Sequence, residues 1–329
     1  MTNRILLYNS GGGLGDAIQI LPLINSLKRE FTNAEFYYLS AHQNHFNTTL
    51  KDFNTTIKTL DLELKYFGFR WWHILFAKKK LKKKNIQLFD LIIDLQSKIR
   101  NTLILKSIPH KSFISTSLNF MLSKPILKIK KYKKINYTIA EAINYIFKKN
   151  FLIEEFNINE IDKKILIESE RLLPKNNYVG FSITQGNVYR KKEWPLDRII
   201  EVSQILVKKN KIPVFLIEKK YTDIINKIKN AVPSSLFPEN ESNINSPALV
   251  TCLGKRLEFV ISIDNGIMHM LSLSKVPIIS LFGPTDSEKF APDYKNSIIL
   301  DSKKIYKSND VSAITVEDVL MAAKQFLNS

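Results

Sequence analysis

Two kinds of hydrophobic pattern alternate along the first forty residues. A short apolar run at residues 4–8 predicts a buried strand, and the glycines of residues 11–15 predict a loop. Apolar residues then recur at helical spacing over residues 16–31, and residues 34–39 predict a second strand. Strand, loop, helix and strand in this order form the βαβ unit from which parallel sheets are built.

The same alternation returns in the second half of the chain. Short apolar runs predict strands and amphipathic stretches predict helices; the strands are 178–183, 213–217, 259–263 and 277–282, and the helices are 196–209, 222–231, 265–274 and 315–327. Residues 89–95 predict a further strand, buried on both faces. Residues 109–150 are irregular and rich in lysine, which predicts loops and helices at a domain edge.

These patterns predict an α/β protein with two Rossmann-like domains, residues 1–160 and 161–329, facing each other across a cleft. A length of 329 residues is typical of two domains. The weakly periodic residues 151–175 are expected to form the passage between the domains. Ligands of such sheets bind at the carboxyl ends of the strands, so the loops after the strands are where chemistry is expected.

The composition of the chain indicates the cellular compartment in which the protein is expected. Hydrophobic residues make up 44% of the chain, which is enough for an ordinary core, yet no run approaches the ~18 uncharged apolar residues of a membrane helix. The first residues do not resemble a signal peptide, and the single cysteine, Cys252, cannot form an intrachain disulfide. We therefore expect a cytoplasmic protein.

The formal net charge of +18 favours an anionic partner, such as an acidic lipid or a phosphorylated glycan. The same charge also fits a second explanation, because a chain crowded with Lys, Asn and Ile is what AT-rich codons produce. Arginine, the preferred reader of bases and bidentate clamp of phosphates, is scarce, which argues against a nucleic-acid-binding protein.

The first loop carries a carboxylate at the start of a helix. Gly13 and Gly15 precede and flank this position, but a dinucleotide fingerprint fails because its third glycine would fall on Asp16. The second strand also lacks the following acid that binds a ribose, and no Gly-Lys-Ser/Thr of a P-loop is present. Asp16 is thus either a general base or a complement to the helix dipole.

Three further segments lie at predicted strand ends. The sequence from Asp264 to His269 opens a helix and is either an anion-binding turn or an ordinary N-cap. Lys192 precedes another helix and can hold a phosphate, whereas the adjoining Trp194-Pro195 favours a structural plug. Residues 281–285, Leu-Phe-Gly-Pro-Thr, are expected to shape the wall of the cleft.

Together these segments resemble glycosyltransferase family 9, the ADP-heptose:lipopolysaccharide heptosyltransferases. The resemblance rests on a Gly-Asp pair in the first loop, a K-x-W-P segment, a D-x-G-x-x-H segment and a strand ending L-F-G-P-T, in that order. Residues 89–96 also look like the central strand of the family's first domain. The likeness covers residues 4 to about 295.

The resemblance implies a GT-B fold that binds the acceptor mainly in the first domain and the nucleotide sugar mainly in the second. It places Asp16 at the catalytic-base position, with Gly13 and Gly15 in the loop at the cleft. The donor and its phosphates would be bound by residues of the second domain: Thr184, Gln185, Lys192, Asp264, Asn265, Gly266, Ile267 and His269. Asn265 departs from the family's usual Thr, and Glu218 is only a weak candidate for the family's ribose-binding acid.

The implied reaction is an inverting, metal-independent transfer of heptose or a related sugar from an ADP-linked donor to a lipopolysaccharide-core-type acceptor, without a cofactor. No D-x-D pair stands at a strand end to bind a metal, and we interpret His42 and His45 as part of a solvated loop. Two alternatives stay open: a GT-B enzyme that uses another nucleotide sugar, and a non-catalytic basic binding protein.

A basic run adjoins a group of aromatic residues at residues 70–84. Arginine, two tryptophans and a phenylalanine precede six lysines, a combination that suits the surface of an anionic membrane. The acceptor would be lipid-anchored, so this surface would place the protein at the inner face of the inner membrane. Alternatively, Trp72, Leu75 and Phe76 pack into the core and only the lysines are solvated. Residues 128–134 form a similar run.

Overall fold

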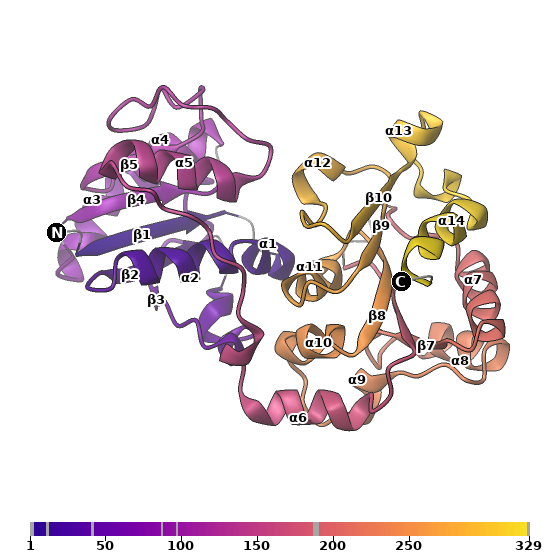
Figure 1. Ribbon diagram of the computed structural model, residues 1–329. Coiled ribbons are helices and arrows are strands. Elements are labelled where there is room, and N and C mark those ends of the chain that lie inside the picture. Colours follow the sequence, from indigo (N-terminus) through magenta and orange to yellow (C-terminus); the bar gives the residue numbers. More distant parts are fainter. Residues whose placement is uncertain are drawn as a thin grey trace. The chain divides into compact units, whose positions relative to one another are not determined.

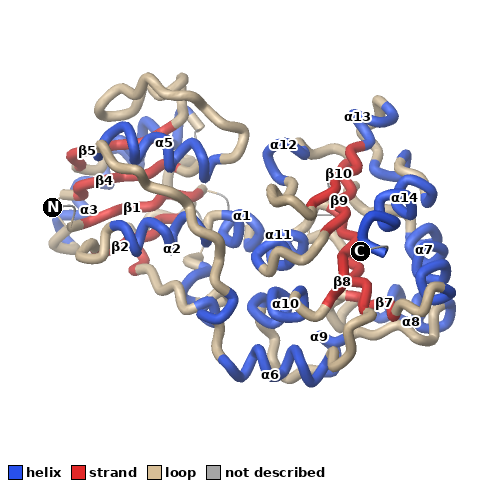
Figure 2. The backbone as a smooth tube through the Cα atoms, viewed as in Figure 1, coloured by secondary structure: helices blue, strands red, loops and turns tan. Residues whose placement is uncertain are grey.

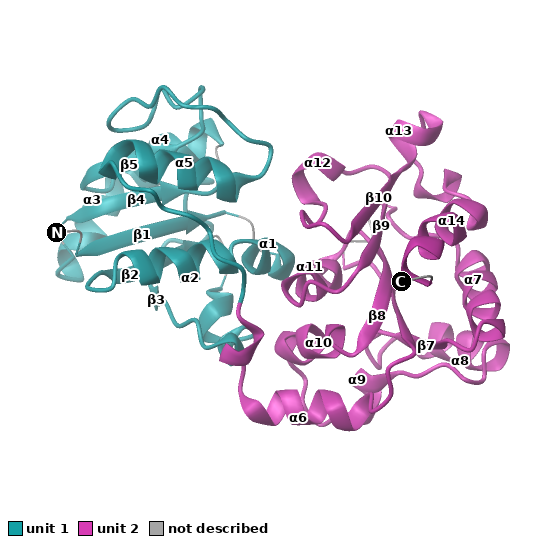
Figure 3. Ribbon diagram, in the orientation of Figure 1, with its two compact units in different colours: residues 1–156 teal, residues 157–329 magenta. Residues whose placement is uncertain are grey.

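The computed structural model describes residues 3–10, 13–40, 43–86, 88–96, 98–186 and 191–327. The chain forms two compact units, Met1–Phe156 and Asn157–Ser329, called unit 1 and unit 2 below (Figure 3). Each unit is an α/β structure with helices on both faces of a parallel sheet (Figures 1 and 2). Among the described residues, no helix is both long and apolar enough to cross a bilayer.

Unit 1 is built on a parallel sheet of strand order β3-β2-β1-β4-β5. Its strands are β1 (Arg4–Asn9), β2 (Glu35–Ser40), β3 (Lys58–Thr59), β4 (Phe89–Asp94) and β5 (His110–Ser115). Its helices are α1 (Leu14–Gln19), α2 (Leu21–Glu30), α3 (His73–Lys83), α4 (Ile99–Lys106) and α5 (Ile135–Phe147), with short 3₁₀ turns η1 (His45–Asn47) and η2 (Lys51–Phe53).

The two faces of this sheet are covered by different helices. Leu6 and Tyr8 of β1 point to the face where α3 and α4 pack, and Ala77 of α3 joins this core. Figure 1 shows α2 and α5 on the opposite face. Alternation along the strand places Ile5 and Leu7, both fully buried, toward that second layer. A central strand buried on both faces explains the continuous apolar run seen in the sequence.

Unit 2 repeats the arrangement with strand order β10-β9-β8-β6-β7, again parallel. Its strands are β6 (Tyr178–Ser182), β7 (Ile212–Phe215), β8 (Leu257–Ile263), β9 (Ile278–Phe282) and β10 (Ser297–Asp301). Its helices are α6 (Lys163–Leu172), α7 (Leu196–Lys208), α8 (Thr222–Ala231), α9 (Pro238–Glu241), α10 (Pro247–Gly254), α11 (Gly266–Leu273), α12 (Ser287–Phe290), α13 (Ser302–Tyr306) and α14 (Val316–Leu327), with the 3₁₀ turns η3 (Ile158–Glu160) and η5 (Val311–Ala313).

The core of unit 2 lies between this sheet and helices α7, α8 and α14, where Phe181, Phe215 and Ile261 meet side chains such as Val202 and Val319. Helices α10 and α11 lie on the other side of the sheet in Figure 2. The parallel register brings the carboxyl ends of β6 and β8 level, with Ser182 beside Ser262. The loops that follow these two strands are therefore neighbours.

Most predicted elements are confirmed, with three corrections. The helix expected over 16–31 is two helices that meet at Ile20, because Pro22 has no N–H to continue the first helix. The stretch 109–150 contains the edge strand β5, whose first three residues are polar and are partly buried or exposed. The fully buried helix α10 was missed because residues 247–254 are apolar all round and show no amphipathic period.

Candidate functional site

The loops after β6 and β8 bring a lysine and an aspartate together in unit 2. Lys192 Nζ lies 2.5 Å from Asp264 Oδ2 and 3.1 Å from the main-chain oxygen of Asp264. The Lys192 side chain is 15% exposed and that of Asp264 is 6% exposed, so the ion pair is largely shielded from solvent. The backbone N–H of Lys192 donates to Gln185 Oε1 at 2.8 Å, which ties Lys192 to the segment directly after β6.

Asn265 joins the loop after β6 to the start of α11. Its Oδ1 accepts from the N–H of Met268 at 2.8 Å, which makes Asn265 the N-cap. Its Nδ2 donates to Ser182 Oγ at 2.7 Å and to the main-chain oxygen of Thr184 at 2.9 Å. Because the side chain is engaged in this way, the first-turn N–H groups of Gly266 and Ile267 are the donors best placed for an anion.

Three other predicted donor-binding residues belong to the same two segments. Thr184 and Gln185 follow β6, and His269 lies on α11, with each side chain almost entirely buried. The structure places residues 184, 185 and 192 after β6 and residues 264–269 after β8, at the same edge of the sheet, and their binding of a donor stays a prediction. The ordinary N-cap and the anion-binding turn are thus not exclusive, since Asn265 performs the first role and leaves the neighbouring backbone free for the second.

Glu218, the candidate ribose contact, follows β7 at the same edge of the sheet. It is exposed and forms an ion pair with Lys220 at 2.8 Å. A second acid, Glu239 on α9, stands near it: the Glu218 charge adds to burial in raising the pKa of Glu239 to about 7. The buried Glu239 Oε1 has no hydrogen-bond partner within the described residues.

Sequence reasoning missed Glu239 because its place depends on a contact between distant segments. Leu236 pairs as an isolated parallel bridge with Val214 of β7, which carries the chain on to α9 beside the end of that strand. No motif marks this pairing. Ser182, by contrast, was within reach, because it lies at the end of the predicted strand 178–183 and strand ends are where ligands bind.

Two predicted features of unit 2 serve the framework. Trp194 is buried, and its Nε1 donates to the main-chain oxygen of Ile314 at 2.9 Å, so the structural-plug interpretation is confirmed. At Gly283 in the turn after β9, an added Cβ would come within 2.7 Å of the backbone nitrogen of Val311. The glycine thus permits the close approach of the 309–311 segment.

Asp16 belongs to unit 1. It lies in the first turn of α1, is partly buried, and raises the pKa of the buried Tyr38 phenol through its negative charge, a smaller effect than burial itself. Gly13 is the N-cap of α1, and a Cβ there would lie 3.3 Å from Asp16 Oδ2, whereas Gly15 is inside the helix. The glycines at 11 and 12 and the histidine at 42 lie outside the described residues.

A second carboxylate of unit 1, Asp94, is enclosed at the end of β4. It is fully buried and accepts hydrogen bonds from Thr102 Oγ1 at 2.5 Å and Ser115 Oγ at 2.9 Å. Its other oxygen accepts from the N–H of Gln96 at 3.0 Å. These contacts tie β4, α4 and β5 together, so Asp94 holds the framework, whereas Asp16 is only partly buried.

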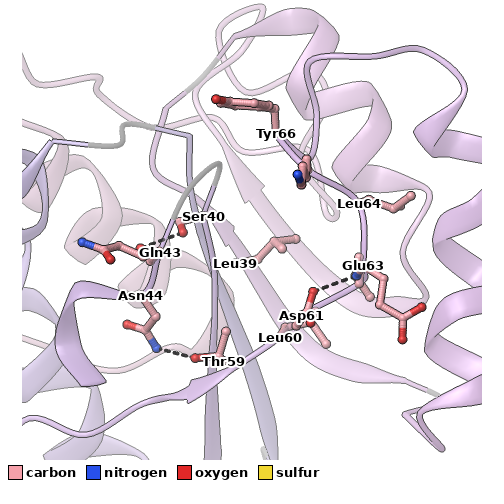
Figure 4. A pocket seen from close by; sticks show the side chains of 12 residues that line it. Leu39, Ser40, Gln43, Asn44, Thr59, Leu60, Asp61, Glu63, Leu64 and Tyr66 are labelled. Carbon is pink, nitrogen blue, oxygen red and sulfur yellow. Dashed lines mark hydrogen bonds between the residues drawn. The ribbon is translucent and has the colours of Figure 1, made fainter. Parts of the chain in front are cut away.

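A pocket of about 590 Å³ lies in unit 1 at the carboxyl ends of β2 and β3 (Figure 4). Polar groups and one aromatic ring dominate its lining: Ser40, Gln43, Asn44, Thr59, Asp61, Glu63, Lys65 and Tyr66, with Leu39, Leu60, Leu62 and Leu64. Glu63 and Tyr66 have left-handed backbones, with φ of 55° and 53°. Such conformations cost free energy in residues other than glycine, and they cluster at functional sites.

One side of this pocket is formed by the segment that contains η1. Asn44 Nδ2 donates to the main-chain oxygen of Ile57 and to Thr59 Oγ1, both at 3.0 Å. The expected solvated loop is wrong at His45, which is buried in the first position of η1, directly after the capping Asn44. Among the residues that the structure describes, no group of three or more His, Cys, Asp or Glu side chains is placed to hold a metal ion.

Solved structures with the same fold are known. The glycosyl transferase family 9 protein from Veillonella parvula DSM 2008 has a TM-score of 0.66 at 17% identity, with 99% of this chain and 97% of that chain covered. E. coli heptosyltransferase WaaC with ADP has a TM-score of 0.67 at 16% identity, with 98% and 99% covered. UDP-GlcNAc 2-epimerase from Methanocaldococcus jannaschii follows with 0.56 at 15%, covering 100% and 93%. No curated protein matches this chain in sequence.

The two parallel sheets and these neighbours define a GT-B protein, a fold shared by transferases and epimerases. The family model of glycosyltransferase family 9 (heptosyltransferase) matches residues 75–320. The chain therefore belongs to glycosyltransferase family 9, and it is a glycosyltransferase.

Proposed function

We propose that this chain transfers heptose, or a closely related sugar, from an ADP-linked donor to a lipopolysaccharide-core-type acceptor, with inversion and without a metal ion or a cofactor. The observation that carries the proposal is the Lys192–Asp264 pair beside the first turn of α11. It joins one cation, two first-turn N–H groups and one carboxylate at the edge of the sheet where ligands of such folds bind.

This arrangement suits a nucleoside diphosphate leaving group. Its charge grows as the bond from the anomeric carbon to the phosphate oxygen breaks, and the Lys192 ammonium and the N–H groups of Gly266 and Ile267 can stabilise that charge. Preorganised donors of this kind are each worth roughly 10²–10³ in rate. An ADP donor is supported by the similar E. coli WaaC structures, which are described with ADP and with ADP-2-deoxy-2-fluoro heptose.

The acceptor oxygen needs a base. We assign this role to Asp16, the partly exposed carboxylate at the start of α1, which accepts the hydroxyl proton as the oxygen attacks the anomeric carbon. One carbon–oxygen bond forms, the bond to the diphosphate breaks on the opposite side, and the configuration inverts. General-base catalysis contributes typically ~10²–10⁴ in rate.

Acids at the end of β7 are proposed to recognise the nucleoside. A carboxylate at this position can accept hydrogen bonds from ribose hydroxyls, and Glu218 is exposed for that contact. Glu239, whose pKa is raised to about 7, is partly protonated at neutral pH and can donate as well as accept. This pairing suits a ribose, which presents both donors and acceptors.

The acceptor is proposed to occupy the unit 1 pocket. Amide and carboxylate groups from Asn44, Asp61 and Glu63 match the donors and acceptors of sugar hydroxyls, and the half-exposed ring of Tyr66 offers an apolar face to a sugar ring. The strained backbone at Glu63 and Tyr66 supports a functional rather than a purely structural loop. The lipid-anchored acceptor would place the enzyme in the cytoplasm, at the inner face of the inner membrane.

The test is a thermal-shift titration with ADP, UDP, GDP and CDP, each in EDTA and in magnesium, on the wild type, Lys192→Ala and the exposed-lysine control Lys219→Ala. A ligand at ~100 times its dissociation constant adds ~2.7 kcal/mol to the free energy of unfolding. We expect an ADP shift in EDTA that the control retains and Lys192→Ala loses, each variant being compared with its own ligand-free form. A thermal shift with a different nucleotide would assign the donor to that nucleotide instead of ADP. The absence of any shift would favour a non-catalytic binding protein.

A further inference from the structure

Helix α3 and the turn before it expose four large apolar side chains. Trp71, Trp72, Leu75 and Phe76 are 55%, 50%, 76% and 43% exposed. The opposite face of the helix is buried and packs on the unit 1 sheet through residues such as Ala77. The alternative that Trp72, Leu75 and Phe76 pack into the core is therefore wrong, because α3 satisfies the sheet with its other face.

The exposed apolar group continues directly into positive charge. Lys78, Lys79 and Lys82 are exposed on the same helix, and within the described residues no acidic side chain lies within ion-pair distance of them. The Arg70 guanidinium lies 5.1 Å from the centre of the Trp72 ring. The surface formed by residues 70–72, 75, 76, 78, 79 and 82, called the α3 face below, thus combines aromatic and aliphatic groups with unpaired cations.

We propose that the α3 face docks on the surface of an anionic lipid bilayer. Tryptophan and phenylalanine settle at the boundary of headgroups and acyl chains, leucine enters the apolar layer, and lysines reach the lipid phosphates along their flexible stems. Nucleic acid would satisfy the lysines, but it offers nothing to an aliphatic side chain as exposed as Leu75. A bilayer satisfies both parts of the α3 face.

Glu63 connects helix α3 to the pocket of unit 1. Glu63 lines the pocket and also pairs with Lys80 of α3, with Lys84 3.8 Å away. A bilayer on the α3 face would therefore lie beside the pocket proposed for the acceptor. This connection rests on the proposed function, whereas the docking itself rests only on the exposure and charge of α3.

The experiment is co-sedimentation of the full chain with phosphatidylglycerol vesicles and with phosphatidylcholine vesicles, without donor or acceptor. Three variants are compared with the wild type: Leu75→Ser with Phe76→Ser, Lys78→Gln with Lys79→Gln and Lys82→Gln, and a control, Ile167→Ser with Met321→Ser. The control changes side chains of unit 2 helices that are 64% and 68% exposed. Thermal melting confirms that each variant folds.

We expect binding to phosphatidylglycerol only. The triple lysine variant should bind about 100-fold more weakly, at about 1 kcal/mol for each charge, with the wild type losing affinity in salt. The Leu75/Phe76 variant should bind at least tenfold more weakly, and the control should bind as the wild type does. Equal affinity of all proteins, or binding to RNA that only the lysine variant loses, would overturn the proposal. So would a wild-type dimer in size-exclusion chromatography that Leu75→Ser with Phe76→Ser converts to a monomer.

Failure of docking and failure of the proposed function are distinguishable. Vesicle binding needs no nucleotide, and the nucleotide titration needs no vesicle. Docking without any nucleotide shift would leave a membrane-bound protein of another activity, whereas a nucleotide shift without docking would leave the transferase and remove only its membrane surface.

Discussion

Lys192 Nζ and Asp264 Oδ2 lie 2.5 Å apart although 72 positions separate them in the sequence. The pair exists because β6 and β8 are neighbours in the sheet and both loops leave from the same edge. The lysine would attract a bound diphosphate and the aspartate would repel it. Removing one or the other should therefore change the affinity for the diphosphate in opposite directions.

Removing the lysine should weaken ADP binding, and removing the aspartate should not. Lys192→Ala loses a charge-assisted hydrogen bond of about 1.5–3 kcal/mol, which corresponds to about 10–100-fold in affinity. Asp264→Ala frees Lys192 and removes a repelling charge, so ADP should bind equally or more tightly, while turnover of the sugar donor falls. Isothermal titration and steady-state kinetics measure both. A loss of ADP affinity of the same size in both variants would show that the pair only supports the loop.

Asp16→Asn should abolish most turnover and leave nucleotide binding unchanged. The amide cannot accept the acceptor proton, so kcat should fall by about 10²–10⁴. Asp16 lies in unit 1, whereas the proposed phosphate contacts lie in unit 2, so the thermal shift with ADP should persist. Near-wild-type turnover would assign Asp16 to the helix dipole instead.

Asn265 is expected to be important for stability. Asn265→Ala removes the N-cap and both Nδ2 hydrogen bonds, which should lower the free energy of unfolding by about 1–3 kcal/mol. Asn265→Thr, the residue usual in the family, retains a cap oxygen and should lose less. Urea denaturation monitored by circular dichroism measures the difference. If both variants unfold at the wild-type midpoint, the contact with Ser182 does not contribute to stability.

Stability should fall as the pH rises through the titration of Glu239. Burial and the Glu218 charge raise the pKa of Glu239 to about 7 in the folded protein, whereas an unfolded Glu titrates near about 4.3. Between these values the folded state holds the extra proton, so the free energy of unfolding decreases with increasing pH, by about 3–4 kcal/mol in all. Glu239→Gln should match the wild type near pH 4 and exceed it at pH 8. Parallel pH profiles for the two proteins would contradict this assignment.

Changes in the unit 1 pocket should affect the acceptor and not the donor. Tyr66→Ala removes the exposed ring and Asp61→Asn removes one acceptor of sugar hydroxyls, so each should raise the acceptor KM several-fold, by about 1 kcal/mol for one contact. The donor KM should stay constant, because the proposed donor contacts belong to unit 2. An exposed control, Leu152→Ala, should change neither constant. Equal changes in the two KM values would exclude the pocket as an acceptor site.

The sequence by itself determined the two α/β halves and the strand ends at which the candidate donor-binding residues lie. Parallel strands that are buried on both faces appear in the sequence as continuous apolar runs. Once such strands pair, the motifs that follow them lie at the same edge of the sheet. For this reason residues 184 to 269 could be grouped before their geometry was known, and Trp194 could be assigned to the framework.

Only the tertiary structure decided which polar and amphipathic groups are buried and which are exposed. Helix α3 can bury either face by its periodicity, and the packing of Ala77 on the sheet is what leaves Leu75 and Phe76 in solvent. Likewise, the bridge between Leu236 and Val214 brings Glu239 to the end of β7, where burial and the Glu218 charge raise its pKa, and Asn265 acquires its partners from the neighbouring strand. These properties depend on contacts between residues distant in the chain, and such contacts leave no local periodicity to read.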